Sequence, residues 1–179
     1  MSVTRRQIAE TFERHVNERG YSGTTLDEVA RELRISKKTI YVHFEGKRDI
    51  YLSVVAHNAR RERLRFAASV APIPTFAGKV EALVRALLEM GRQHIVRTGQ
   101  EEWLEEYEIA ADTYRKAQGD LLREVVQDGM DAQEFRAGDA SLVEKMVVAM
   151  VVEYLLLVNA DPAYDRDSEL VARIGRFIG

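Results

Sequence analysis

The 179-residue sequence contains no cysteine, which excludes disulfide frameworks, thiolate metal sites and cysteine nucleophiles. Only three prolines interrupt the chain, so long stretches are free of helix breakers. Long hydrophobic runs are absent too: in the most apolar stretch, 142–158, Lys145 and Glu153 enclose only seven apolar residues, whereas a membrane span needs about 20. The N-terminus likewise lacks the apolar run of a signal peptide. We therefore expect a soluble, cytoplasmic protein that does not enter a membrane.

Known catalytic and metal-binding patterns are also missing. The four histidines, at positions 15, 43, 57 and 94, have no metal-ligand spacing. The sequence contains no Gly-rich phosphate loop, G-x-S-x-G or H-E-x-x-H motif. The acidic run 101–108 allows two interpretations, carboxylate metal ligands or a solvated helix face, and the second is favoured. We expect no enzyme activity, no cofactor and no metal.

Charge is distributed unevenly along the chain. Residues 1–66 hold 14 Lys and Arg against 9 Asp and Glu, whereas residues 67–179 hold 12 against 20. A basic first third on an acidic remainder is typical of a polyanion-binding module attached to a body with another task. A solvated basic face would give the same count, so charge alone leaves both interpretations open.

Apolar residues recur at helical spacing throughout, as at Ile8, Phe12 and Val16, and the sequence predicts an all-α fold. Two prolines in the segment 71–74 must end one helix. Glycines mark other breaks, including one at Gly119. The sequence predicts about nine helices, near residues 3–19, 26–33, 37–43, 47–70, 75–97, 100–117, 119–133, 139–159 and 166–178.

Residues 24–48 carry a helix-turn-helix pattern. Thr25 and Glu28 fit a capping box, in which each side chain bonds the other residue's backbone N–H at a helix start. Ala30 is small enough to let a second helix cross closely, and Ser36 is placed to cap that second helix. The residues predicted to point inward from the turn and the second helix are Ile35, Ile40 and Phe44.

The outer face of this second helix carries side chains suited to phosphates and base edges. The residues on this face or at the helix ends are Ser36, Lys37, Lys38, Thr39, Tyr41, Val42 and His43. The alternative is a helical hairpin with a solvated polar face. The combination of caps, turn and basic residues favours nucleic-acid binding.

Residues 5–52 resemble the DNA-binding domain of the TetR family of bacterial transcriptional regulators. The matching elements are Ile8-Ala9, Gly20-Tyr21-Ser22-Gly23-Thr24-Thr25, Val29-Ala30, Ile35-Ser36, Thr39-Ile40-Tyr41, His43-Phe44, Lys47 and Ile50-Tyr51. The resemblance implies a three-helix helix-turn-helix domain at residues 1–48. It also implies that residues 49–179 form a helical bundle for ligand binding and dimerisation.

The resemblance further implies roles in DNA binding. Thr25 and Tyr41 would hold phosphates through their hydroxyls, and Lys47 would pair with a phosphate near the start of the fourth helix. His43 would either contact a phosphate or pack beside Tyr41. The residues placed at the helix start and nearest the base edges are Ser36, Lys37, Lys38 and Thr39.

Two residues depart from the family pattern. Arg34 stands where the family usually has a glycine in the turn, and a left-handed backbone there would cost about 1 kcal/mol. Lys38 stands where a small residue is common, and its longer side chain changes how closely the helix approaches a groove. The operator therefore cannot be inferred from relatives.

Apolar residues surround the predicted helix at 142–158, which indicates contact with both the body and a second subunit. A central core helix in a monomer is the alternative. The residues predicted at the dimer interface are Leu142, Met146, Met150, Tyr154, Leu170, Ile174 and Phe177.

Aromatic and methionine residues in the middle of the chain are typical of the adaptable walls of an apolar pocket, or of ordinary core packing. Those assigned to a pocket are Met90, His94, Trp103, Tyr107, Tyr114 and Met130. We expect a homodimeric repressor that leaves a palindromic double-stranded DNA operator when it binds a small apolar or aromatic effector. The alternative function is a helical protein that binds an effector or partner without controlling a promoter.

Overall fold

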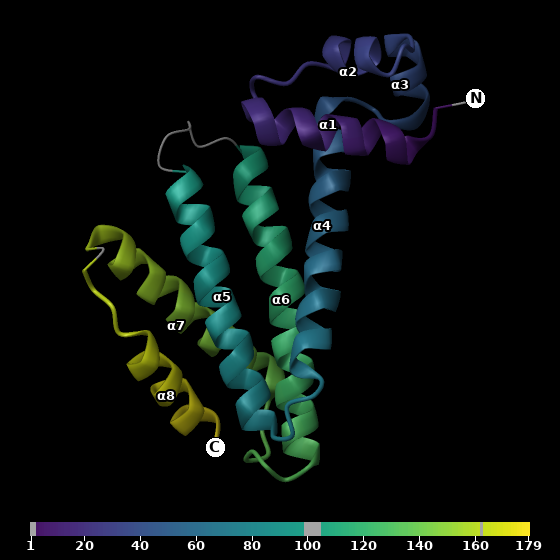
Figure 1. Cartoon of the computed structure of the whole chain (residues 1–179). Coiled ribbons are helices and arrows are strands. Elements are labelled where there is room, and N and C mark those ends of the chain that lie inside the picture. The colour runs from purple at the N-terminus through teal and green to yellow at the C-terminus, as the bar shows by residue number, and fades with distance from the viewer. Residues whose placement is uncertain (1–2, 99–104, 162) are drawn as a thin grey trace. The chain divides into compact units, whose positions relative to one another are not determined.

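The computed structural model describes residues 3–98, 105–161 and 163–179, without the side chains of residues 93–98, 106 and 107. Within these residues the chain forms eight helices and no strand, so the all-α prediction is confirmed (Figure 1). The helices are α1 (Arg5–Arg19), α2 (Leu26–Glu32), α3 (Lys37–His43), α4 (Lys47–Val70), α5 (Phe76–Thr98), α6 (Glu105–Asp131), α7 (Ala140–Ala160) and α8 (Asp167–Ile178).

Helix ends follow the local sequence. Thr4 and Gln7 form a capping box at the start of α1, and Asp139 caps α7 by accepting hydrogen bonds from the backbone N–H of Ser141 and Leu142. α4 ends at Val70, immediately before the segment that contains two prolines. These ends lie within a few residues of the predicted ones.

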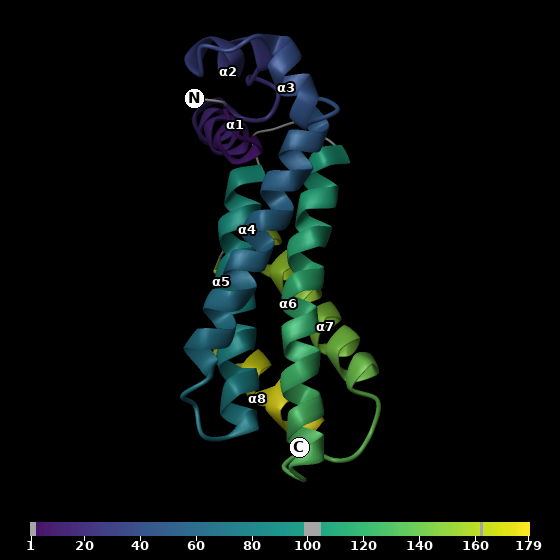
Figure 2. The ribbon, with the colours of Figure 1, turned by 90° about the vertical axis from the view of Figure 1, so that its right-hand side faces the viewer.

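The predicted break at Gly119 is wrong, because α6 continues through this residue as one helix (Figure 2). A Cβ atom at position 119 would lie 2.4 Å from a carboxylate oxygen of Glu144 on α7. The glycine therefore leaves room for the end of the flexible Glu144 side chain and does not end the helix. The two helices predicted at 100–117 and 119–133 are a single element over the part of the chain that the structure describes.

The chain divides into two compact units. The first contains Met1–Arg60 and Leu104–Tyr114, and the second contains Arg61–Trp103 and Arg115–Gly179. Because α4 and α6 each begin in the first unit and continue into the second, the helices themselves connect the units. The domain boundary at residue 48 stays a prediction.

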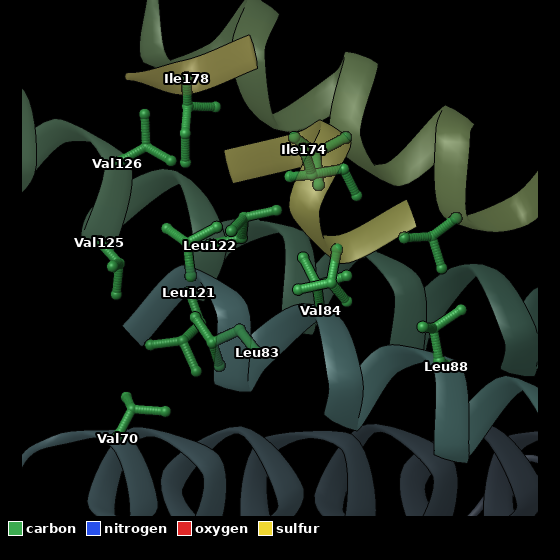
Figure 3. Packing of buried hydrophobic residues seen from close by; sticks show 14 of the residues in the cluster. Val70, Leu83, Val84, Leu88, Leu121, Leu122, Val125, Val126, Ile174 and Ile178 are labelled. Atoms are coloured by element: carbon green, nitrogen blue, oxygen red, sulfur yellow. The ribbon is translucent and has the colours of Figure 1, made fainter. Parts of the chain in front are cut away.

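Each unit has its own hydrophobic core. In the first unit, fully buried side chains from the first four helices pack together, namely Ile8, Phe12, Val29, Ile40 and Ile50. In the second unit, buried side chains of α4, α5, α6 and α8 point toward one another, among them Val70, Val84, Leu122 and Ile174 (Figure 3). Burying each such side chain contributes about 1.5–3 kcal/mol to folding.

None of the described helices combines the length and apolarity that crossing a membrane would require.

Candidate nucleic-acid interface

The first unit holds α2 and α3 in a helix-turn-helix arrangement. At the start of α2, the Thr25 hydroxyl accepts from the backbone N–H of Glu28 at 3.3 Å, and the Glu28 carboxylate accepts from the backbone N–H of Thr25 at 3.1 Å. Val29 and Ala30 are buried on the inner face of α2, where it packs against α1 and α3. The predicted capping box is confirmed, and the small side chain of Ala30 is buried.

The turn between the two helices depends on a left-handed residue. Arg34 has a φ angle of 54°, so the predicted left-handed backbone at this non-glycine position is confirmed. This conformation lets the backbone N–H of Ile35 reach the carbonyl oxygen of Ala30 at 2.9 Å, which closes the end of α2. A left-handed arginine costs about 1–2 kcal/mol relative to a right-handed one.

α3 is anchored on one side and open on the other. Ile40 is completely buried and Phe44 is buried just after the helix, whereas Tyr41 is 53% and Val42 74% exposed. The Ser36 hydroxyl accepts from the backbone N–H of Thr39 at 3.2 Å and caps the helix as predicted. The anchored side thus fixes the direction in which the opposite face of α3 points.

The two lysines at the start of α3 differ in their surroundings. The Lys37 ammonium lies 2.8 Å from an Asp27 carboxylate oxygen on α2, and this hydrogen bond raises the pKa of Lys37 above its ordinary value. Among the residues that the structure describes, exposed Lys38 forms no ion pair. Lys38 therefore presents its charge outward, while the charge of Lys37 is paired with Asp27.

The remaining predicted DNA contacts surround α3. Thr25 is exposed, but its hydroxyl already donates to the Glu28 carboxylate at 2.9 Å, an interaction that lowers the pKa of Glu28. The Lys47 ammonium lies 4.2 Å from the Tyr21 ring centroid at the start of α4. His43 and Thr39 are half-buried at the edge of the exposed face.

Two residues near this face received no role from the sequence. The Arg5 guanidinium stacks at 3.9 Å on the Phe44 ring and donates to the backbone carbonyl of His43, which ties α1 to the end of α3. This contact joins positions 38 residues apart, so no sequence pattern indicates it. Val42 was placed outside by its helical position, but its apolar side chain matched no expected phosphate or hydrogen-bonding contact.

The predicted dimer residues fall into three groups. Leu142, Met146 and Phe177 are 56%, 42% and 43% exposed. Tyr154 and Ile174 are buried inside the second unit, and the Tyr154 hydroxyl donates to an Asp167 carboxylate oxygen at 2.7 Å. The remaining two, Met150 and Leu170, are half-buried. The exposed apolar surface of α7 also includes Val152, Leu156 and Leu157, which the sequence did not single out.

The predicted pocket residues that the structure describes fall in both units. Met90 and Met130 are half-buried in the second unit, whereas Tyr114 packs on the core of the first. All of Trp103, and the side chains of His94 and Tyr107, lie outside the described residues.

A groove of about 500 Å³ between α5 and α8 is lined by other residues, including Thr75, Gly78, Arg85, Ser168 and Gly175. In the described part of the chain, no group of three or more His, Asp and Glu side chains is arranged to hold a metal ion.

Comparison with known proteins places the helix-turn-helix in a family. The sequence model described as "Bacterial regulatory proteins, tetR family" matches residues 13–54. The biofilm operon icaADBC HTH-type negative transcriptional regulator IcaR of Staphylococcus aureus (strain Newman) is 49% identical over 35 residues. That similarity spans 20% of this chain and 19% of IcaR, about a fifth of each protein.

Solved structures share the fold over nearly the whole chain. NemR of E. coli in its reduced form matches with a TM-score of 0.68 and 16% identity, covering 98% of this chain and 97% of NemR. The regulator FadR of Bacillus subtilis, in complex with stearoyl-CoA, matches with a TM-score of 0.62 and 17% identity over 97% of both chains. At these identities the similarity establishes the fold alone.

The matched domain and the IcaR similarity lie on the helix-turn-helix that the structure shows, and the fold extends the agreement over the remaining helices. The predicted absence of enzyme activity agrees with a family of transcriptional regulators. Residues 13–54 of this chain match the tetR family of bacterial regulatory proteins, and the remaining helices share the fold of solved regulators at 16–17% identity.

Proposed function

We propose that this protein is a cytoplasmic, homodimeric transcriptional repressor that binds a palindromic operator through α3 and is released by a small-molecule effector. The observation that carries the proposal is the opposition of the two sides of α3: Ile40 is completely buried, while Lys38 and Tyr41 are exposed on the outside. Such a helix is held rigidly by its core side and offers the other side to the major groove.

The proposed contacts follow the chemistry of each side chain. Lys38 and Thr39 read base edges, joined by Lys37 once DNA replaces Asp27 as its partner. Tyr41 and Lys47 bind phosphates, and Thr25 does so by sharing a hydroxyl that now donates to Glu28. The other residues assigned to the interface are Ser36 and His43.

Dimerisation supplies the second recognition helix. Two half-sites one helical turn apart, about 34–36 Å, need two copies of α3. We assign the contact to the exposed apolar residues of α7 and α8, chiefly Leu142, Met146 and Phe177, because charged and polar residues would normally cover such a surface.

Repression and release are supported by similarity. IcaR is a negative regulator, and FadR was solved with stearoyl-CoA, so proteins with this domain or fold include a repressor and a ligand-binding regulator. The effector would bind in the second unit as an apolar or aromatic molecule. The effector must bind more tightly to the conformation that does not bind DNA. Equal affinity for both conformations would leave their populations unchanged.

Selection of binding sites from random and genomic DNA fragments tests the proposal, with purified protein at physiological salt followed by sequencing. Enrichment of a palindrome is the expected result, and Lys38→Ala should weaken its binding. The matched control is Lys79→Ala on α5, which lies in the second unit. Salt-sensitive retention of all sequences would contradict sequence-specific regulation and favour a helical interaction protein.

A further inference from the structure

Val42 lies on the exposed face of α3. It is 74% exposed, more than any other large hydrophobic side chain found on the surface of the described residues. Lys38 lies four residues earlier, one helical turn away, so the two side chains project within about 40° of each other. Completely buried Ile40 lies on the opposite side of the helix.

Single exposed hydrophobic residues are common on protein surfaces and usually have no function. Two features distinguish Val42. It lies beside the cation Lys38, with which it shares the face that the proposed function presents to DNA. A branched side chain in a helix also occupies essentially one rotamer, so its methyl groups are already positioned before binding.

The major groove offers one kind of apolar group to such a side chain in ordinary DNA. A, G and C present only donors and acceptors on their groove edges, whereas T adds its C5-methyl group. A valine in the groove opposite other bases would desolvate their polar edges without a compensating hydrogen bond. Opposite thymine, a methyl group of the valine packs against the C5-methyl group of the base, and both are buried.

We infer that Val42 is a specificity-determining residue that packs against the 5-methyl group of one thymine in each operator half-site. This inference rests on the proposed function and names the base that α3 recognises at this position. Four residues of helix span about 6 Å, and base pairs are about 3.4 Å apart. The thymine therefore lies within about two base pairs of the base that Lys38 contacts. We expect that base to be guanine, whose major-groove acceptors match a lysine ammonium.

The test replaces thymine by deoxyuridine, which removes only the methyl group, at each thymine of the selected operator in turn. Binding of the full-length protein is measured by titration at fixed salt. At one position per half-site the substitution should weaken wild-type binding by about fourfold, the effect of losing one buried methyl group. Val42→Ala should bind the thymine operator more weakly and should no longer distinguish thymine from deoxyuridine at that position.

Lys38→Ala serves as the matched control, since it removes a neighbouring contact on the same face. It should weaken binding yet retain the fourfold preference for thymine. Val42→Ala replaces an exposed residue by a stronger helix former, so circular dichroism should show an intact fold.

An operator that tolerates deoxyuridine everywhere, or a thymine preference that survives in Val42→Ala, would overturn the inference while leaving a sequence-specific regulator. Failure to select any operator would instead reject the proposed function itself.

Discussion

The two units expose different chemistry at their surfaces. On α3 of the first unit, two lysines, a tyrosine and one valine are exposed, whereas α7 of the second unit exposes Leu142, Met146 and Leu156 among other apolar side chains. A polar face with one apolar group suits a polar groove that must be read base by base. A broad apolar face suits a second protein surface, where area and shape matter more than individual donors. The following predictions test this contrast.

Removing the anchor of α3 should have the largest effect on the first unit. Ile40→Ala deletes a completely buried side chain and should lower the free energy of unfolding by about 2–5 kcal/mol, with loss of DNA binding. Urea denaturation measures the stability. Val42→Ala, two residues along the same helix, should change it by less than about 0.5 kcal/mol, and equal losses in the two variants would contradict the assigned orientation of α3.

A charge on the exposed surface of α7 should break the dimer. Leu142→Glu places a carboxylate where the proposed partner subunit would bury it, and dimer affinity should fall about 100-fold or more. Sedimentation should show the 20.4 kDa monomer at concentrations where the wild type has twice this mass. Arg136→Glu, at an exposed polar position outside α7 and α8, gives the comparison. A wild type that is already monomeric would reject the proposed interface.

An ionic cluster makes the second unit acid-sensitive. The Arg92 guanidinium binds both carboxylate oxygens of Asp167, at 2.7 and 2.5 Å, and holds the pKa of Asp167 below its ordinary value of 3.8. Because the folded-state pKa is lowered, the stabilisation is complete above pH 3.8 and is lost as the pH falls through the lower folded-state pKa.

Asp167→Asn should destabilise the protein by about 1.5–3 kcal/mol at pH 6 and flatten the acid dependence of the urea midpoint. An unchanged acid dependence in the variant would assign it to other carboxylates.

Lys47 should contribute to DNA affinity at every sequence. Lys47→Ala removes one phosphate contact, so the slope of log affinity against log salt concentration should decrease by about one unit. Lys79→Ala in the second unit should leave the slope unchanged. A slope equal to that of the wild type would remove Lys47 from the interface.

The smallest expected effects concern two left-handed residues, one in each unit. Arg34 and Gln133 have φ angles of 54° and 61°, and glycine adopts this conformation without steric cost. Arg34→Gly and Gln133→Gly should each raise the free energy of unfolding by up to about 1 kcal/mol. The relief of backbone strain in the folded state should exceed the cost of the greater entropy that glycine gives the unfolded chain. Thermal unfolding of the two single variants measures this, and a loss in either one would show that the arginine or glutamine side chain stabilises its turn.

Prediction of the fold and the site from the sequence succeeded where residues close together in the chain determine the local structure. The capping box of Thr25 and Glu28, the inward Ile40 and the left-handed Arg34 are all determined by residues within one or two helical turns. It failed where a residue's role depends on a distant neighbour. Gly119 was predicted to stop a helix, but α6 continues through it beside the Glu144 side chain of α7. Tyr154 was predicted at the dimer interface, but it is buried within its own unit with its hydroxyl bound to Asp167.

The helical fold class, the helix-turn-helix and its resemblance to the tetR family could be predicted from the sequence, because periodicity, caps and turn residues act over short distances. Only the tertiary structure decided which apolar residues of α7 and α8 are exposed and which groove residues lie together. It also showed that Lys37 is paired with Asp27 while Lys38 is not. Those outcomes depend on how separate helices pack, and many different side chains satisfy such packing equally well.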